Sequence, residues 1–246
     1  MMATLEGKRV LVTGASSGLG RHFATVLARE GADVMLAARR VEALQALAAE
    51  IGGRATCLPL DVTDVASIEA VAEEAGPIDV LVNNAGVAGA RAVLDTTPQE
   101  YDHIMDTNLR GAFLMATSIG RGMRERGNGG AIVNIASILG LRQGGQLAVY
   151  AMSKAAVVQM TKQMALECAR YGIRVNALAP GYFATDMNRD FLSSKLGEAM
   201  TQRIPQRRFG TFEDLDGPLL LLCSDASRYM TGVVIPVDGG HTVSSL

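Results

Sequence analysis

The chain has 246 residues, of which 48% are hydrophobic and 20% are charged, and its formal net charge is −2. This length suits one α/β domain with a large buried core, and the scattered Lys and Arg residues exclude the basic surface that nucleic-acid binding requires. No apolar run approaches the ~20 residues that span a bilayer, and we expect no signal peptide. The three cysteines are too widely spaced for a disulfide framework or a metal site and suit a reducing cytoplasm: Cys57, Cys168 and Cys223.

Strand-like and helix-like segments alternate along the chain. Because the predicted strands are continuously apolar, both of their faces should be buried, which indicates a doubly wound parallel sheet with helices on both sides. Pro236 cannot donate to a sheet ladder, so the last strand should lie at an edge. The predicted strands are Val10–Val12, Val34–Ala38, Leu58–Leu60, Val80–Val82, Ile132–Ile135, Arg174–Leu178 and Val233–Val237. The predicted helices are Leu19–Glu30, Val41–Ile51, Ser67–Glu74, Tyr101–Arg124, Tyr150–Tyr171 and Phe212–Leu222.

A glycine-rich turn follows the first predicted strand, with the sequence Thr13-Gly14-Ala15-Ser16-Ser17-Gly18-Leu19-Gly20. Missing β-carbons let the backbone approach a pyrophosphate, and the helix that follows offers free N–H groups and a positive dipole end. Tight turns look similar in many proteins, but the place of this one within a complete βαβ unit favours a dinucleotide clamp.

The end of the second predicted strand, Ala37-Ala38-Arg39-Arg40, bears on cofactor choice. An acidic residue here would bind a free ribose 2′-hydroxyl, whereas a guanidinium is a good phosphate partner. The sequence therefore favours NADP over NAD through Arg39, although both arginines would also fit as solvated residues at a helix start. Asp61 ends the third strand and would accept a hydrogen bond from the adenine amino group, or cap the next helix, for which Thr63-Asp64 is better placed.

Tyr150 and Lys154 are four residues apart and share one face of a predicted helix. With Ser137 and the clamp, they indicate hydride transfer between a nicotinamide cofactor and a carbonyl or alcohol. A tyrosine titrates near ~10, and lowering its pKa to 7 takes roughly 4 kcal/mol, which the Lys154 ammonium and an oxidised nicotinamide would both favour. Ser137 would orient the substrate oxygen. Singly, these residues would fit a surface pair and a helix cap.

In order and spacing, these motifs resemble the short-chain dehydrogenase/reductase family in its single-domain form of about 250 residues. The resemblance covers essentially the whole chain and extends to Asn83-Asn84-Ala85-Gly86, Asn108, Pro180-Gly181 and Val237-Asp238-Gly239-Gly240. It implies a Rossmann-type sheet of seven parallel strands, one dinucleotide-binding and catalytic domain over residues 1–246, NADP or NAD as cofactor, and chemistry without a metal.

The resemblance also implies where the residues act. The segment from Asn84 to Gly86 would lie along the adenosine side and Pro180-Gly181 at the nicotinamide end, while Asn108 would hold a water that links Lys154 to solvent; alternatively, Asn108 is merely solvated. The expected catalytic residues are Asn108, Ser137, Tyr150 and Lys154. The expected cofactor-binding residues are Gly14, Ser16, Ser17, Gly18, Leu19, Gly20, Arg39, Asp61, Val62, Asn84, Ala85, Gly86, Tyr150, Lys154, Pro180, Gly181, Phe183 and Thr185.

Family members that prefer NADP carry an Arg where Arg39 stands, and some also carry a basic residue just before the second glycine. Ser17 occupies that second place, so the expected NADP preference rests on one position. The family implies a homotetramer, with the two long helices pairing across one two-fold axis and the last strand across another; the alternative is a monomer with Met-rich core helices. Apolar residues on more than one side mark these helices: Met105, Leu109, Ala112, Phe113, Ala116 and Ile119 on one, and Met152, Ala155, Val158, Met160 and Met164 on the other.

The expected substrate is a small secondary alcohol or ketone, in a mostly apolar pocket. The pocket would be bounded by Ile138–Gln146, Tyr182–Asp186 and Phe183–Pro205, with polar contacts from Arg142, Gln143 and Gln146. Two alternatives within the family remain open, a sugar or polyol dehydrogenase and a 3-oxoacyl-[acyl-carrier-protein] reductase. The reductase is the weaker alternative, because Ala131 and Tyr171 stand where such reductases often carry basic residues, although Arg124, Arg126 and Arg170 are nearby. A non-catalytic cofactor sensor is disfavoured because Tyr150 and Lys154 are both present.

Overall fold

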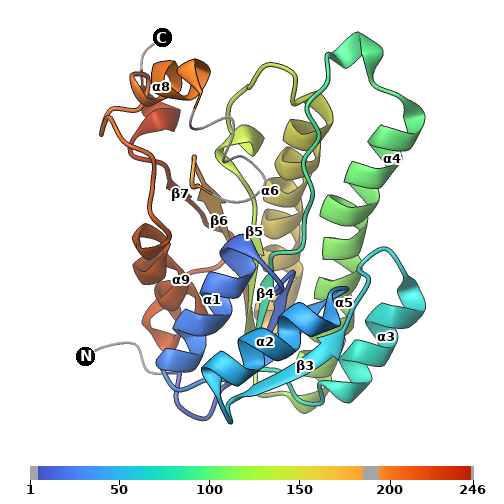
Figure 1. Cartoon of the computed structure of the whole chain (residues 1–246). Helices are drawn as coiled ribbons and strands as arrows, with labels where there is room; N and C mark the ends of the chain where they lie inside the picture. Colours follow the sequence, from blue (N-terminus) through green and yellow to red (C-terminus); the bar gives the residue numbers. More distant parts are fainter. Residues whose placement is uncertain (1–4, 185–193, 245–246) are drawn as a thin grey trace.

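The computed structural model describes residues 5–184 and 194–244, and within them the strands form one parallel sheet. The strand order is β3-β2-β1-β4-β5-β6-β7, so the chain winds outward from β1 in one direction and from β4 in the other (Figure 1). The predicted doubly wound sheet of seven parallel strands is confirmed. The strands are β1 (Arg9–Thr13), β2 (Asp33–Ala38), β3 (Ala55–Pro59), β4 (Val80–Asn83), β5 (Gly130–Ile135), β6 (Ile173–Pro180) and β7 (Val234–Val237).

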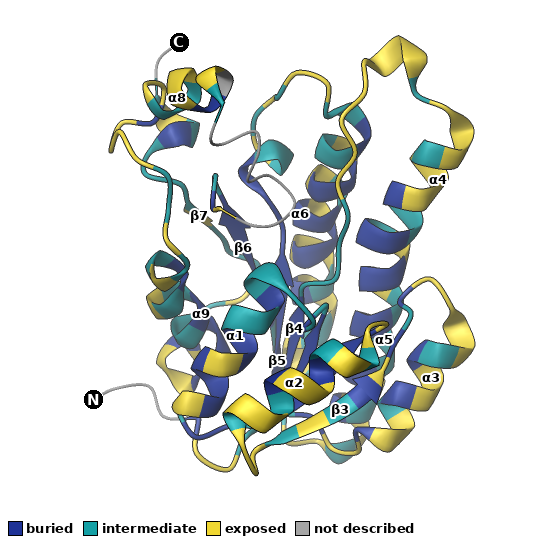
Figure 2. Cartoon of the chain, viewed as in Figure 1, coloured by how far each residue is buried: buried dark blue, intermediate teal, exposed yellow. Residues whose placement is uncertain are grey.

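Helices cover both faces of the sheet: α1, α2 and α9 lie on one side, and α3, α5 and α6 on the other (Figure 1). The inner strands of the sheet and the inner faces of the helices are buried, while the exposed residues gather on the edge strand β3, on the outer faces of the helices and at the loops (Figure 2). The helices are α1 (Gly18–Arg29), α2 (Val41–Ile51), α3 (Val65–Glu74), α4 (Pro98–Met105), α5 (Ala112–Arg126), α6 (Ala148–Cys168), α8 (Lys195–Thr201) and α9 (Asp216–Cys223).

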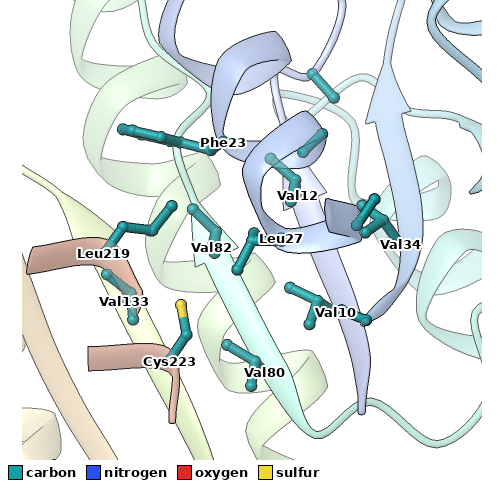
Figure 3. Packing of buried hydrophobic residues seen from close by; sticks show 14 of the residues in the cluster. Val10, Val12, Phe23, Leu27, Val34, Val80, Val82, Val133, Leu219 and Cys223 are labelled. Atoms are coloured by element: carbon teal, nitrogen blue, oxygen red, sulfur yellow. The ribbon is translucent and has the colours of Figure 1, made fainter. Parts of the chain in front are cut away.

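The core between the sheet and α1 explains why the predicted strands lack a polar face. Phe23 and Leu27 of α1 are fully buried against strand residues, and Leu219 of α9 packs into the same cluster. Burying a side chain of this size contributes about 1.5–3 kcal/mol. Figure 3 shows the strand side chains that face these helices: Val10, Val12, Val34, Val80, Val82 and Val133.

The two edge strands differ in how well the sequence predicts them. β7 lies at the edge and pairs with β6, as Pro236 predicts. At the other edge, β3 begins at Ala55, three residues before the predicted strand Leu58–Leu60, which was wrong at both ends. Ala55, Thr56 and Cys57 are partly or fully exposed, so this half of the strand has no apolar run to reveal it.

The long helix predicted over Tyr101–Arg124 is present, but it is not α-helical throughout. It consists of α4, a six-residue π-helical segment (Asp106–Gly111) that the sequence did not predict, and α5, which follow one another without a break. The Asn108 side chain bonds neighbouring elements and the Thr107 hydroxyl donates to the His103 carbonyl at 2.8 Å, so this stretch is held in a wider turn. Such π segments often accompany functional sites.

No helix in the described ranges combines the length and apolarity that crossing a membrane requires.

Candidate active site

A cavity of about 410 Å³ lies at the carboxyl ends of the strands, where β1 and β4 are neighbours and the strand order reverses. This is the switch point at which doubly wound sheets bind ligands. Of the residues predicted for the site, Asn108 lies behind the wall and Thr185 lies outside the described residues. All the others line the cavity: Gly14, Ser16, Ser17, Gly18, Leu19, Gly20, Arg39, Asp61, Val62, Asn84, Ala85, Gly86, Ser137, Tyr150, Lys154, Pro180, Gly181 and Phe183.

The glycine-rich turn packs too closely for a side chain at Gly14 or Gly20. A β-carbon on Gly20 would lie 2.2 Å from the Gly14 carbonyl oxygen and 2.5 Å from Asn84 Nδ2, and Gly14 itself has a φ of +68°. Ser17 caps α1 without a side-chain hydrogen bond to its first turn, so that turn retains N–H groups for a ligand at the positive end of the helix. The turn therefore fits a bound pyrophosphate.

Thr13 joins the ends of β1 and β4. Its hydroxyl accepts hydrogen bonds from the backbone N–H groups of Asn84 and Ala85, both at 3.0 Å, and Asn84 Nδ2 donates to the Thr13 carbonyl at 2.9 Å. The Asn83-Asn84-Ala85-Gly86 segment is thereby held against the glycine-rich turn, on one wall of the cavity.

Two arginines stand at the end of β2, and they are placed differently. Arg39 lines the cavity and is exposed. Arg40 reaches back over the glycine-rich turn and donates from Nη2 to Ser17 Oγ at 2.7 Å and to Ser16 Oγ at 3.1 Å. Arg40 thus brings a second guanidinium to Ser17, the place where the sequence itself has no basic residue, and the expected NADP preference stays a prediction.

Asp61 turns its carboxylate toward its own loop. Oδ1 accepts from the Thr63 N–H at 2.9 Å and from the Thr63 hydroxyl at 2.7 Å, and these bonds lower the pKa of Asp61. Asp64, rather than Asp61, caps α3, by accepting from the Ala66 N–H. Asp61 therefore stays ionised at the cavity wall.

Ser137 links the end of β5 to the tyrosine. Its hydroxyl oxygen accepts from the Leu139 N–H at 3.1 Å and so caps a short 3₁₀ helix, η3 (Ile138–Gly140). The helix-cap explanation is confirmed, and the position of Ser137 beside the substrate stays a prediction. Burial raises the pKa of Tyr150, and the nearby Ser137 side chain acts in the opposite direction.

Lys154 is held between Tyr150 and the end of β5. Nζ donates to the Ile135 carbonyl at 2.8 Å and lies 5.9 Å from the centre of the Tyr150 ring. The side chain is only 5% exposed, and burial lowers its pKa from 10.5 to about 8. Burial acts against the charged form at both residues, and the expected lowering of the Tyr150 pKa by the Lys154 ammonium and an oxidised nicotinamide stays a prediction.

Asn108 is a buried connector rather than a solvated residue. It is 1% exposed; Nδ2 donates to the Val87 carbonyl at 2.8 Å and to Ser153 Oγ at 3.0 Å, while Oδ1 accepts from the Val87 N–H at 2.7 Å. Ser153 precedes Lys154 on α6. The π-helical segment is therefore fastened both to the loop after β4 and to the helix that carries Tyr150 and Lys154.

Sequence reasoning missed several lining residues because most of them are small or apolar and carry no chemical signal. Ile135 and Ala136 immediately precede Ser137, so their place at a strand end would have revealed them. Arg40 was noted only as a neighbour of Arg39. The lining residues absent from the expected set are Ala37, Ala38, Arg40, Leu60, Thr63, Val87, Thr107, Ile135 and Ala136.

Known proteins match this chain along nearly its whole length. The sequence profile of the family described as "Enoyl-(Acyl carrier protein) reductase" matches residues 14–242. An L-rhamnose 1-dehydrogenase (NAD(P)(+)) of Azotobacter vinelandii is 41% identical, over 98% of either protein. A 3-oxoacyl-[acyl-carrier-protein] reductase FabG of Escherichia coli is 38% identical, over 96% of this chain and 97% of the reductase.

A solved structure agrees in fold as well. The crystal structure of a gluconate 5-dehydrogenase from Burkholderia cenocepacia, in complex with NADP and tartrate, superposes with a TM-score of 0.95 at 36% identity, over 98% of each chain. The likeness therefore includes the strands and loops that line the cavity.

Proposed function

The chain belongs to the short-chain dehydrogenase/reductase family and is an NAD(P)-dependent oxidoreductase of CH–OH groups, and on this premise we propose that it interconverts a secondary alcohol and a ketone on a sugar-derived substrate, with NADP preferred. The observation that carries the proposal is the Ser137, Tyr150 and Lys154 cluster at one end of the clamp cavity. We further propose that residues 1–246 act as one dinucleotide-binding and catalytic domain.

Tyr150 gives a proton to the carbonyl oxygen in reduction and takes it back in oxidation. Ser137 donates a hydrogen bond to the same oxygen and fixes its position beside the phenol. The bound cofactor supplies or accepts the hydride. Because burial raises the pKa of Tyr150, its phenol is protonated at neutral pH and can donate the proton in reduction. In oxidation, any positive charge brought into the cavity would favour the phenolate, which accepts the proton.

Lys154 and Asn108 support this proton transfer from behind. Lys154 Nζ, fixed by the Ile135 carbonyl, is placed to hold the ribose hydroxyls of a dinucleotide and to act on the Tyr150 hydroxyl through them. Asn108 fixes Val87 and Ser153 and stands where the resemblance to the family assigns a water relay between Lys154 and solvent.

The preference for NADP is supported by two guanidinium groups and no carboxylate at the end of β2. Arg39 borders the cavity and Arg40 lies over Ser17, so a 2′-phosphate would meet cations from two sides. The residues of the glycine-rich turn fit the pyrophosphate, and the wall from Asn84 to Gly86 fits the adenosine part of the cofactor.

A second candidate is a 3-oxoacyl-[acyl-carrier-protein] reductase, which the E. coli relative favours. The basic residues that could bind an acidic carrier protein already make contacts within this chain. The Arg124 and Arg170 guanidiniums lie 5.8 and 4.9 Å from the Tyr171 ring centre, and Arg126 donates to the Ile78 carbonyl. This candidate therefore ranks below the sugar-derived substrate.

We also propose that the enzyme is a homotetramer. Apolar side chains that a monomer would cover stand exposed on three neighbouring helices: Tyr101 on α4, Phe113 on α5, and Met152 and Leu166 on α6. Of the residues predicted to mark these helices, some belong to the core, as expected for the side that faces the sheet: Ala112, Ala116, Ile119, Val158 and Met160. Light scattering should give four chains, and a monomeric mass would contradict the proposal.

The first experiment measures thermal unfolding with NADPH, NADH or no cofactor, followed by a substrate panel read by nicotinamide absorbance. The panel contains L-rhamnose, D-gluconate, D-glucitol and a short 3-oxoacyl thioester. A ligand that binds only the folded state at 100 times its dissociation constant adds roughly 2.7 kcal/mol of stability. We expect the larger shift with NADPH and turnover of at least one sugar derivative. Turnover of the thioester alone would favour the second candidate, and no shift with either cofactor would contradict both.

A further inference from the structure

A second polar cluster lies next to the cavity, where the chain continues beyond Ser137 and Gly181. The chain leaves Ser137 through η3, where a β-carbon on Gly140 would lie 2.7 Å from the Lys154 backbone, and then carries Arg142 outward. Tyr182 stands between Gly181 and Phe183, which both line the cavity. Its side chain is close enough to Tyr150 to act on the pKa of that residue in the raising direction. Tyr182 therefore connects this cluster to the cavity that Tyr150 lines.

Three separate segments meet in this cluster. Arg142 Nη1 donates to the backbone carbonyl of His241, which ties the loop after η3 to the chain beyond β7. The His241 ring lies 5.6 Å from the Tyr182 ring, centre to centre, and Phe209 lies 6.3 Å from Tyr182 on another segment. The Tyr182 carbonyl accepts from the Gly210 N–H at 3.0 Å, so its backbone is fixed as well.

His241 has an unsatisfied buried atom. The residue is 4% exposed, and its Nδ1 has no hydrogen-bond partner among the described residues. Burial and the Arg142 charge lower the pKa of His241, so the ring is neutral near pH 7 and carries one N–H. The His241 ring therefore carries one hydrogen-bond donor and one acceptor, and it lies beside Tyr182.

The charge of the cluster is positive. The Arg142 and Arg203 guanidiniums both oppose the rise that burial produces in the pKa of Tyr182, and both lower the pKa of His241. Asp238 is the nearby carboxylate that acts on His241, but its Oδ1 accepts from Gly240 and its Oδ2 from Thr242. Among the described residues, neither arginine has a carboxylate within salt-bridge distance.

We propose that Arg142, Arg203, Tyr182 and His241 form a recognition site for a carboxylate on the substrate, so that the enzyme acts on a hydroxy acid and its oxo acid rather than on a neutral polyol. The inference rests on the proposed function, because it names the substrate class for the site at Tyr150. Arg142 uses one nitrogen on His241 and keeps others of its planar fork, which matches a carboxylate. The Tyr182 hydroxyl adds a neutral polar group at the same place.

The test compares two substrates of equal chain length, D-gluconate and D-glucitol, with NADP. The wild type should have a kcat/KM at least about tenfold higher for the acid, because a hydrogen bond to a charged group is worth roughly tenfold or more. Arg142→Met should lower the acid-to-polyol ratio by about tenfold to hundredfold, mainly through KM, and Arg142→Lys should restore part of it. Arg121→Met is the matched control: it removes one exposed arginine on α5 and should leave the ratio unchanged.

Two further arms keep the inference separable from the proposed function. Arg203→Met removes the second charge without the His241 contact, so it tests the site even where Arg142→Met does not fold. Calorimetry of tartrate binding to the NADP complex should give weaker binding in either variant than in the wild type.

If polyols and neutral ketones turn over with no preference for acids, or both variants change the two substrates equally, the carboxylate site is wrong and the proposed function stands. If no substrate turns over and no cofactor binds, the proposed function fails. Tartrate that binds wild type and variants alike would overturn the carboxylate site independently of turnover.

Discussion

The two ends of the cavity are built on different physical terms. At the end that we propose to be catalytic, here the catalytic end, Ser137, Lys154 and Asn108 are buried and each is tied to a neighbouring element by hydrogen bonds within the protein. At the end that we propose to bind the adenosine part of the cofactor, here the adenosine end, Arg39 and Arg40 are exposed and project from a single strand end.

This difference in burial decides at which end a charged side chain destabilises the folded protein. At the buried end, desolvation moves the pKa of Lys154 down and that of Tyr150 up, and each group is fixed in one geometry. At the exposed end, water screens the arginines, so a charge there adds selectivity at little structural cost. Substitutions should therefore have large effects at the catalytic end and graded ones at the adenosine end.

Tyr150→Phe tests the buried end most severely. Removing the hydroxyl leaves the ring in place but takes away the proton donor, and general acid–base groups contribute about 10²- to 10⁴-fold. We expect kcat to fall by that factor while the NADPH-induced thermal shift persists. Tyr229→Phe is the control, because Tyr229 is fully exposed. A variant that retains normal turnover would show that another group moves the proton.

Lys154→Met tests how expensive the buried charge is. The pKa of Lys154 is lowered from 10.5 to about 8 in the folded protein, so between these values the unfolded chain binds a proton that the folded protein has lost. Stability contributed by this residue therefore rises with pH across that window, by about 3 kcal/mol in total. Urea unfolding at fixed protein concentration, at pH 7.5 and pH 10, should show the wild type gaining on the variant by up to that amount.

The control for this measurement is Lys162→Met, which removes an exposed lysine from the same helix. All other titrations are shared with the wild type and cancel in the difference. The unfolding free energies of wild type and Lys162→Met should keep a constant gap between the two pH values. A constant gap for Lys154→Met as well would mean that Lys154 is hydrated rather than desolvated.

Gly20→Ala tests the junction between the two ends by steric means. The new methyl group would lie 2.2 Å from the Gly14 carbonyl oxygen, so the glycine-rich turn has to move away from α1. Overpacking of this kind costs typically about 1–3 kcal/mol, which should appear as lower stability and as NADPH binding weakened by about tenfold or more. Gly53→Ala should change neither, because nothing lies within 4 Å of its added carbon.

Apolar strand runs and helix periodicity predicted the sheet well because burial on both faces leaves a strong pattern. The same reasoning failed for β3, whose first half is exposed at the edge, and it did not show the π-helical segment within the helix predicted over Tyr101–Arg124. There the Asn108 side chain bonds Val87 and Ser153, partners 21 and 45 residues away. Such partners are invisible to a local pattern.

The candidate site was predicted through residues with chemical character, and its remainder was missed for two reasons. Ala37, Ile135 and Ala136 line the cavity but are apolar residues without a chemical signal in the sequence. His241 and Arg142 meet because the loop after β5 and the segment after β7 come together in space, 99 residues apart in the chain. At position 17, sequence reasoning considered only the serine that stands there. It therefore missed the Arg40 guanidinium, which reaches Ser17 from the end of the next strand.

The exposed end should respond in small, additive steps. Arg39→Asp removes a cation and introduces a carboxylate opposite the 2′-phosphate, so it should shift the NADP/NAD ratio of kcat/KM toward NAD by more than Arg40→Gln does. Arg40→Gln removes one screened cation and should lower the ratio by about threefold to tenfold. Arg208→Gln, at an exposed ion pair with Asp214, controls for the loss of a surface charge. Since the Arg40 guanidinium also bonds Ser16 and Ser17, its loss should weaken NADH binding slightly as well, whereas Arg39→Asp should not. An Arg40→Gln variant with an unchanged ratio would limit Arg40 to holding the glycine-rich turn and return the selectivity to Arg39 alone.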